Sequence, residues 1–144
     1  MDIALASDHA GFEMKEALKG YLEGLGHTVV DCGPANDDRA DYPDFAVPVC
    51  EKVASGAVER GVLVCGTGIG MAIAANKMAG IRAANVITPE FAQLAREHND
   101  ANVITLSGRF VDEATNKAIL DTFLTTEFAG GRHAGRVEKL NALD

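Results

Sequence analysis

The sequence lacks several features that define whole classes of protein. It has no tryptophan and three cysteines, at positions 32, 50 and 65, an odd number without a C-x-x-C spacing. Neither a disulfide framework nor a zinc site is indicated, and we expect reduced thiols and a cytoplasmic location. No apolar run approaches the roughly 20 residues that cross a bilayer. The acidic start, Met1-Asp2, is unlike the basic beginning of a signal peptide.

Positive charge is also scarce. Thirteen Lys and Arg residues stand against 21 Asp and Glu residues, which gives a net charge of −8. Without a basic stretch, neither nucleic acid nor an anionic membrane is an expected partner. The four histidines, at positions 9, 27, 98 and 133, have no metal-ligand spacing, so no metal is expected. A small anionic substrate is still compatible, because a few arginines can surround one pocket.

What is present favours one globular domain over residues 1–144. Hydrophobic residues make up 47% of the chain and charged residues 24%, ordinary values for a soluble protein that buries a core. Short apolar runs alternate with helical periodicity, which indicates a parallel sheet covered on both faces. We therefore predict a three-layer, doubly wound (Rossmann-like) α/β domain with a five-stranded parallel sheet and a C-terminal helix. The expected strands are 3–6, 28–30, 62–65, 81–86 and 102–106, and the expected helices are 14–25, 43–54, 71–78, 89–98 and 112–124.

The turns that follow the strands are the expected ligand-binding segments. Right-handed crossovers bring all of them to one edge of a parallel sheet, where ligands bind. The turn 66–70, Gly-Thr-Gly-Ile-Gly, contains three glycines, and backbone N–H groups there can form an anion nest at a helix N-terminus. It matches neither G-x-G-x-x-G nor a P-loop, so dinucleotide and NTP binding are disfavoured. The alternative interpretation is a tight turn without a ligand.

Cys65 precedes this turn directly. A helix N-terminus and nearby donors would favour a thiolate and make Cys65 a base or nucleophile. It can equally be a small apolar residue that ends a buried strand.

Other polar residues have both a functional and a structural interpretation. Asp8 and His9 follow the first strand, and Arg109 follows the fifth. His98, with Asn99 after it, ends a helix, where negative potential suits a proton donor, although a histidine beside Phe91 is often a packing residue. Arg132 and Arg136 are four residues apart in the main basic cluster of the chain, so they either bind phosphate or form an exposed helix face.

Taken together, these residues resemble the type B ribose-5-phosphate isomerase family, which also includes galactose-6-phosphate isomerases. The resemblance extends over nearly the whole chain, in the order of the family's motifs. The matching stretches are Ser-Asp-His-Ala-Gly-Phe (7–12), Asp-Tyr-Pro (41–43), Cys-Gly-Thr-Gly-Ile-Gly (65–70), Ala-Ala-Asn-Lys (74–77), Gly-Ile-Arg-Ala (80–83), His-Asn-Asp-Ala-Asn-Val (98–103) and Gly-Gly-Arg-His-x-x-Arg-Val (130–137).

The resemblance implies reversible conversion of D-ribose 5-phosphate to D-ribulose 5-phosphate, a reaction of the pentose phosphate pathway, through a cis-enediolate and without a cofactor. It implies that Cys65 takes the proton from C2 and that His98, assisted by Asp8, protonates the ring oxygen. Methionine at position 71, where another branch of the family has glutamate, places the chain in the cysteine branch. The remaining implied contacts are enediolate stabilisation by Thr67 and the N–H groups of Gly66, Gly68, Ile69 and Gly70, phosphate binding by His9, Arg109, Arg132 and Arg136, and substrate binding by Asn99.

The resemblance also implies a homodimer or homotetramer whose active site is shared between subunits. Three alternatives stay open on the sequence alone. The substrate can be another sugar phosphate: galactose 6-phosphate, allose 6-phosphate or a four-carbon ketose phosphate. A non-catalytic phosphosugar-binding module would be expected to lack Cys65 or His98. A response-regulator-like domain would carry an acidic residue at position 65.

Overall fold

The computed structural model describes residues 1–144 and contains five strands and six helices in regular alternation. The alternation follows the predicted order closely. The strands are β1 (Asp2–Ser7), β2 (Thr28–Asp31), β3 (Arg60–Cys65), β4 (Ala83–Asn85) and β5 (Val103–Ser107). The helices are α1 (Phe12–Gly24), α2 (Tyr42–Ala54), α3 (Ile69–Asn76), α4 (Pro89–Asn99), α5 (Glu113–Thr125) and α6 (Arg132–Asn141).

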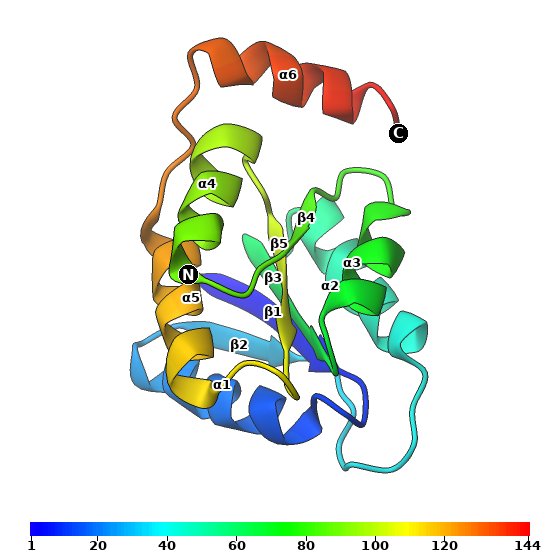
Figure 1. Ribbon diagram of the computed structural model, residues 1–144. Helices are drawn as coiled ribbons and strands as arrows, with labels where there is room; N and C mark the ends of the chain where they lie inside the picture. The colour runs from blue at the N-terminus through cyan, green and yellow to red at the C-terminus, as the bar shows by residue number, and fades with distance from the viewer.

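The five strands form one parallel sheet in the order β2-β1-β3-β5-β4 (Figure 1). The register pairs Ser7 with Val64, and Cys65 with Ser107. The last residues of the three central strands therefore lie at the same edge of the sheet, which we call the carboxyl edge. The opposite edge, where the strands begin, is called the amino edge. The predicted doubly wound fold is confirmed.

Side chains of successive strand residues enter two separate cores, because they point to opposite faces of the sheet. On one face Leu5, Val62 and Ile104 pack against α1, α4 and α5. On the other face Ala4, Leu63 and Cys65 pack against α2 and α3. Both faces of β1 and β3 are thus covered, which explains why these strands are continuous apolar runs.

Helix α6 lies outside this three-layer core. It packs on the end of α4 at the amino edge, at the top of the view in Figure 1. The side chain of Val137 on α6 is buried in this contact, whereas Leu140, one turn further along the helix, is 43% exposed. None of the six helices is long and apolar enough to span a membrane.

Three details differ from the prediction. Helix α3 begins at Ile69 rather than 71, because Gly68 in the left-handed region serves as its N-cap. Strand β4 is shorter than the predicted 81–86, since it pairs with β5 alone at the edge of the sheet. The predicted face of α4, with Phe91, Leu94, Ala95 and His98, is only partly buried: Ala95 enters the core, whereas Phe91 is 59% exposed and Leu94 is 37% exposed.

Candidate active site

Three turns meet at the carboxyl edge, as predicted from the right-handed crossovers of a parallel sheet. The Asp8 N–H donates to the Val64 carbonyl at 3.2 Å, and the Gly108 N–H donates to the Cys65 carbonyl at 2.8 Å. A side chain at Gly11 would lie 2.6 Å from the Val64 carbonyl oxygen, so only glycine allows this close approach. The turns after β1, β3 and β5 therefore form one continuous surface around the end of β3.

Cys65 is the last residue of β3, and its thiol is directed at the glycine turn. The sulfur accepts a hydrogen bond from the Gly68 N–H at 3.1 Å, and the residue is 5% exposed. Gly68 has a φ of +86°, and an added Cβ would collide with the amide oxygen of Asn85. This left-handed turn aims its N–H at the sulfur and places Cys65 beside the first turn of α3.

The glycine turn also has main-chain donors to spare. The N–H groups of Gly66, Thr67 and Gly70 donate to no atom of the chain, as expected at a helix N-terminus. The Ile69 N–H differs, since it donates to the Thr67 hydroxyl at 3.1 Å. The turn is thus a set of fixed donors beside a thiol, an arrangement that suits an oxygen on which negative charge develops.

Asp8, His9 and Arg109 surround this turn. One carboxylate oxygen of Asp8 accepts the Gly11 N–H at 3.0 Å, while the residue is 8% exposed. The His9 Nδ1 contacts the backbone of Ala40, 3.2 Å from its nitrogen and 3.1 Å from its carbonyl oxygen, and this contact positions the ring. The Arg109 guanidinium lies over the turn, with Nη1 3.4 Å from where a Cβ of Gly66 would be. Two groups able to bind a phosphate therefore flank the thiol.

His98 and Asn99 lie at the amino edge, away from Cys65. They are the last two residues of α4, which runs from the carboxyl edge at Pro89 back to the amino edge. Its 11 residues rise about 16 Å. The end of the helix is fixed by Asp100, whose left-handed backbone (φ +48°) stops α4.

Two arginines hold the carboxylate of Asp100. Its Oδ1 accepts a hydrogen bond from Arg96 at 2.8 Å, and its Oδ2 accepts one from Arg82 at 3.3 Å. Both arginines are mostly buried. The turn that follows His98 and Asn99 is therefore rigidly placed.

The C-terminal basic cluster lies beside His98. Arg132 and Arg136 are exposed on α6, and His133 between them is buried and stacks on His98, with ring centroids 4.3 Å apart and planes 14° apart. Burial lowers the pKa of His133, and His98 and the two arginines lower it further. The structure thus brings together His98, Arg132 and Arg136, but at the opposite edge of the sheet from Cys65.

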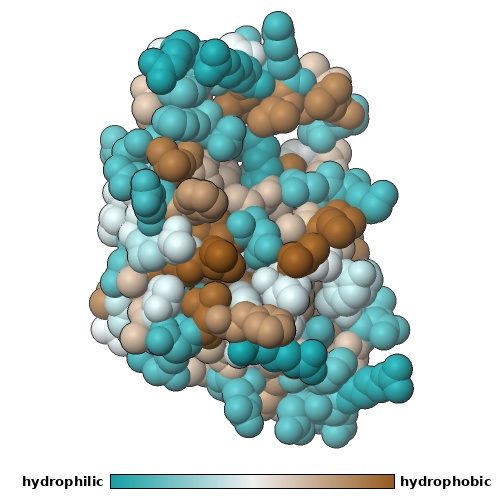
Figure 2. All heavy atoms as spheres, viewed as in Figure 1, coloured by the Kyte–Doolittle hydropathy of each residue, from teal (hydrophilic) through white to brown (hydrophobic).

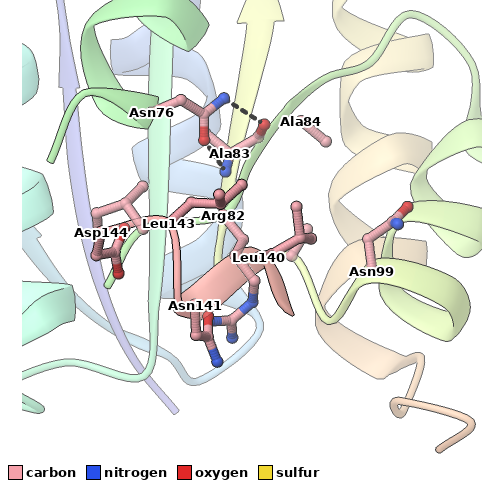
Figure 3. Close-up of a pocket in the computed structure, with 11 residues that line it drawn as sticks. Asn76, Arg82, Ala83, Ala84, Asn99, Leu140, Asn141, Leu143 and Asp144 are labelled. Carbon is pink, nitrogen blue, oxygen red and sulfur yellow. Dashed lines mark hydrogen bonds between the residues drawn. The ribbon is translucent and has the colours of Figure 1, made fainter. Parts of the chain in front are cut away.

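A pocket of about 410 Å³ lies at the amino edge between α6 and the start of β4 (Figure 3). Asn99 lines it together with Leu140 and Arg82, whose guanidinium donates to Asn141 at 3.0 Å. None of its lining residues comes from the turns around Cys65. Within one chain the predicted residues therefore form two half-sites: a carboxyl half-site (Asp8, His9, Cys65, 66–70 and Arg109) and an amino half-site (His98, Asn99, Arg132 and Arg136).

Sequence reasoning missed two residues that shape the carboxyl half-site. The Ser107 hydroxyl donates to the Gly66 carbonyl at 2.7 Å and accepts the Phe110 N–H at 2.9 Å, so it ties two turns together. Tyr42 packs so closely on Gly70 that an added Cβ would lie 2.8 Å from its ring. The Asp-Tyr-Pro stretch that contains Tyr42 was a signal for it, whereas Ser107 had none beyond its place after a strand. No cluster of three or more His, Cys, Asp or Glu side chains could hold a metal ion.

Comparisons with known proteins agree with this geometry. The ribose-5-phosphate isomerase B of Escherichia coli K12 is 44% identical over 142 residues, which cover 99% of this chain and 95% of that protein. The structure of Clostridium thermocellum ribose-5-phosphate isomerase B superposes with a TM-score of 0.98 at 45% identity and covers 99% of this chain and 97% of its own.

A second similar structure carries a ligand. It is the ribose-5-phosphate isomerase B of Mycoplasma genitalium with bound ribulose-5-phosphate, with a TM-score of 0.95, 44% identity and coverage of 99% of this chain and 95% of its own. The family model described as Ribose/Galactose Isomerase matches residues 3–140. The chain belongs to the ribose/galactose isomerase family.

Proposed function

We propose that the protein is an aldose–ketose isomerase that interconverts D-ribose 5-phosphate and D-ribulose 5-phosphate, with Cys65 as the base. The observation that carries this assignment is the hydrogen bond from the Gly68 N–H to the Cys65 sulfur. It places a thiol at the first turn of α3, with spare main-chain donors next to it. Proton transfer next to a carbonyl needs both of these groups at once.

The chemistry follows from this arrangement. The Cys65 thiolate removes the proton from C2 of the open aldehyde, and the C–H electron pair forms the C1–C2 double bond of the enediolate. Negative charge then develops on O1, where the N–H groups of Gly66, Thr67 and Gly70 and the Thr67 hydroxyl stabilise it. One such donor is worth about 3–4 kcal/mol of barrier. Transfer of the O2 proton to O1 makes C2 the carbonyl carbon, and return of the proton from the Cys65 thiol to C1 completes the ketose and restores the thiolate.

No other side chain in the turn can replace Cys65. At position 71, where the other branch of the family has glutamate, this chain has methionine. The Met71 side chain is on α3 and is fully buried in the core that α3 shares with α2. The Thr67 hydroxyl already accepts the Ile69 N–H. In our assignment the Cys65 sulfur is therefore the base.

Ring opening needs the amino half-site as well. Ribose 5-phosphate is a furanose in water, so its ring oxygen must gain a proton before C2 becomes acidic. In our assignment His98 supplies that proton, Asp8 accepts the O1 hydrogen, and Asn99 binds the reacting hydroxyls. Because His98 and Asp8 lie at opposite edges of one sheet, the acid must come from a second copy of the chain.

An exposed apolar patch supports a dimer that joins the two half-sites. Figure 2 shows apolar side chains gathered over the face formed by α3, β4 and α4. Their exposed fractions lie between 37% and 59%, and a contiguous patch of this kind marks an interaction surface. In a two-fold dimer the same patch pairs with itself and can bring the end of α4 to the start of the partner's α3. The patch consists of Ile69, Ile73, Ile87, Phe91 and Leu94.

The phosphate selects the substrate class. His9 and Arg109 of one copy and Arg132 and Arg136 of the other hold the phosphate, and binding this remote group fixes the reacting carbons against the base. Ribose 5-phosphate is the substrate that fits the relatives' names; galactose 6-phosphate, allose 6-phosphate and four-carbon ketose phosphates are the competitors. Such an enzyme works in the cytoplasm, where sugar phosphates are made and thiols stay reduced.

A nuclear magnetic resonance assay in D₂O tests the assignment. Wild-type protein is incubated with five- and six-carbon aldose phosphates, and ketose formation and deuterium incorporation are followed. We expect ribose 5-phosphate to turn over fastest and Cys65→Ala to lose at least about 100-fold in kcat while still binding substrate. Cys32→Ala, which removes a half-buried thiol outside the site, is the matched control. Turnover by Cys65→Ala close to the wild-type rate would remove the thiol from the mechanism.

A further inference from the structure

The stack of His98 and His133 is a feature that the proposed chemistry does not use. His98 comes from the end of α4, and His133 comes from the first turn of α6. The rings lie nearly parallel, with centroids 4.3 Å apart. Neither imidazole forms a hydrogen bond within the chain, so this stacked contact is what defines the plane of the His98 ring. His98 itself is half-buried.

The surroundings of His133 keep its ring uncharged. Burial lowers the pKa of His133, and the neighbouring His98 and the two arginines of α6 add to the effect, against a smaller opposite influence of Glu97. The stack therefore places a neutral ring against the histidine that must carry the proton. Two imidazolium rings at this separation would repel each other, whereas a neutral ring next to a charged one does not.

The backbone on both sides of the stack is fixed independently. The Ala129 N–H donates to the Glu97 carbonyl at 3.1 Å, which ties the segment before α6 to the last turn of α4. Asp100, held by two arginines, ends α4 directly after the catalytic pair of residues. The rings are thus held from both ends, as a positioning contact requires.

We propose that His133 is a positioning residue for the ring-opening step: its imidazole stacks on His98 and holds that ring in the orientation from which it protonates the furanose oxygen. This inference rests on the proposed isomerase function. It assigns to His133 no contact with the substrate, although the flanking Arg132 and Arg136 bind the phosphate. A general acid that is misoriented by a fraction of a ring rotation loses its hydrogen-bond geometry, and with it a large part of its effect.

The two substrates of the reaction separate ring opening from proton abstraction. Ribose 5-phosphate must be opened by His98 before Cys65 can act. Ribulose 5-phosphate cannot close into a five-membered ring, because the hydroxyl that would close it carries the phosphate. Exchange of its C1 hydrogen with D₂O therefore needs Cys65 and the glycine turn but not the ring-opening acid.

The experiment measures both rates in His133→Ala, His133→Phe and wild type. We expect His133→Ala to lower kcat/KM for ribose 5-phosphate about tenfold or more while C1 exchange of ribulose 5-phosphate stays within about twofold. His133→Phe keeps an aromatic ring in the stack and should recover most of the ribose 5-phosphate rate. Unchanged exchange also demonstrates that each variant is folded.

Two control variants test whether the effect is specific to ring opening. Arg132→Ala should slow both reactions, because both substrates carry the phosphate. His27→Ala, a histidine before β2 outside both half-sites, should slow neither. Equal losses of both rates in His133→Ala would mean a general structural role and would overturn the positioning role. An unchanged ribose 5-phosphate rate in His133→Ala, or a failure of His133→Phe to recover that rate, would also overturn it. A wild type inactive on ribose 5-phosphate would instead refute the proposed function, and the inference with it.

Discussion

Complementation between two inactive variants is the sharpest test of a site shared by two copies. Cys65→Ala disables the carboxyl half-site, and His98→Ala disables the amino half-site. The 11 residues of α4 rise about 16 Å between the two edges. A general acid must come within about 3 Å of the group that it protonates. One chain therefore cannot bring His98 and Cys65 to the same sugar.

The magnitude follows from symmetry. In a two-fold dimer each site takes its thiol from one copy and its acid from the other. After equal amounts of the two variants exchange subunits, half of the dimers contain one copy of each. Such a mixed dimer has one intact site and one site that lacks both groups. About one site in four is then wild type, so the mixture should reach about a quarter of wild-type activity although each variant alone has almost none.

The assay is ribulose 5-phosphate formation before and after subunit exchange, achieved by refolding the two variants together. A mixture of His98→Ala with Arg132→Ala is the matched control, because both changes fall in the amino half-site and leave no site intact. If the Cys65→Ala and His98→Ala mixture gains nothing while hetero-dimers are present, or if the control mixture gains as much, the shared site is wrong.

Three further predictions follow from single contacts. Arg132→Ala should raise KM for ribose 5-phosphate about 10- to 100-fold, because one hydrogen bond to a charged group is lost, while turnover of free ribose should change little. An equal change for both sugars would contradict phosphate binding by Arg132. Gly68→Ala forces a φ of +86° on a residue with a Cβ, so it should lower the free energy of unfolding in urea by at least about 1–2 kcal/mol. Gly20→Ala, on the open side of α1, should instead raise the free energy of unfolding by about 0.5–1 kcal/mol. Equal effects of the two substitutions would refute the backbone strain at Gly68. Burial opposes ionisation of Asp31, but hydrogen bonds from a backbone N–H and the fully buried Lys15 prevail and lower its pKa. A carboxylate whose pKa is lowered in the folded state stabilises the fold above about pH 4, and this stabilisation is lost as the pH falls through that lowered pKa. Asp31→Asn should therefore lower the free energy of unfolding by about 1.5–3 kcal/mol at pH 7 and by progressively less in acid. A pH-independent cost would count against the ion pair.

The fold was predictable because its signal is periodic. Runs such as Val62–Cys65 are apolar without alternation, and this pattern is what a strand covered on both faces requires. The edge strand β4 was predicted too long because an apolar run does not reveal how many residues find a pairing partner. The exposed Phe91 and Leu94 illustrate a second limit: periodicity identifies an apolar helix face but not whether it meets the core or another chain.

The site was only partly predictable from the residues. The glycine turn was predictable, since three glycines between a strand and a helix are typical of a loop whose N–H groups bind an anion, and it lies beside Cys65 as expected. The separation of His98 from Cys65 follows from helix direction and is implicit in the element order alone. The stack of His98 on His133 is not implicit in the element order. It joins two residues that are 35 positions apart in the sequence, on helices whose packing no local pattern encodes.

The division into half-sites has a physical reason in the parallel sheet itself. Helix N-termini gather at the carboxyl edge beside Cys65, where their free N–H groups suit the enediolate oxygen. Helix C-termini gather at the amino edge, where α4 ends at His98 and Asn99. One doubly wound chain therefore supplies good environments for the base and the acid, but always on opposite edges. The dimer that we propose, paired through the α3–β4–α4 patch, would resolve the conflict, because each environment would be kept while the two groups meet on one sugar.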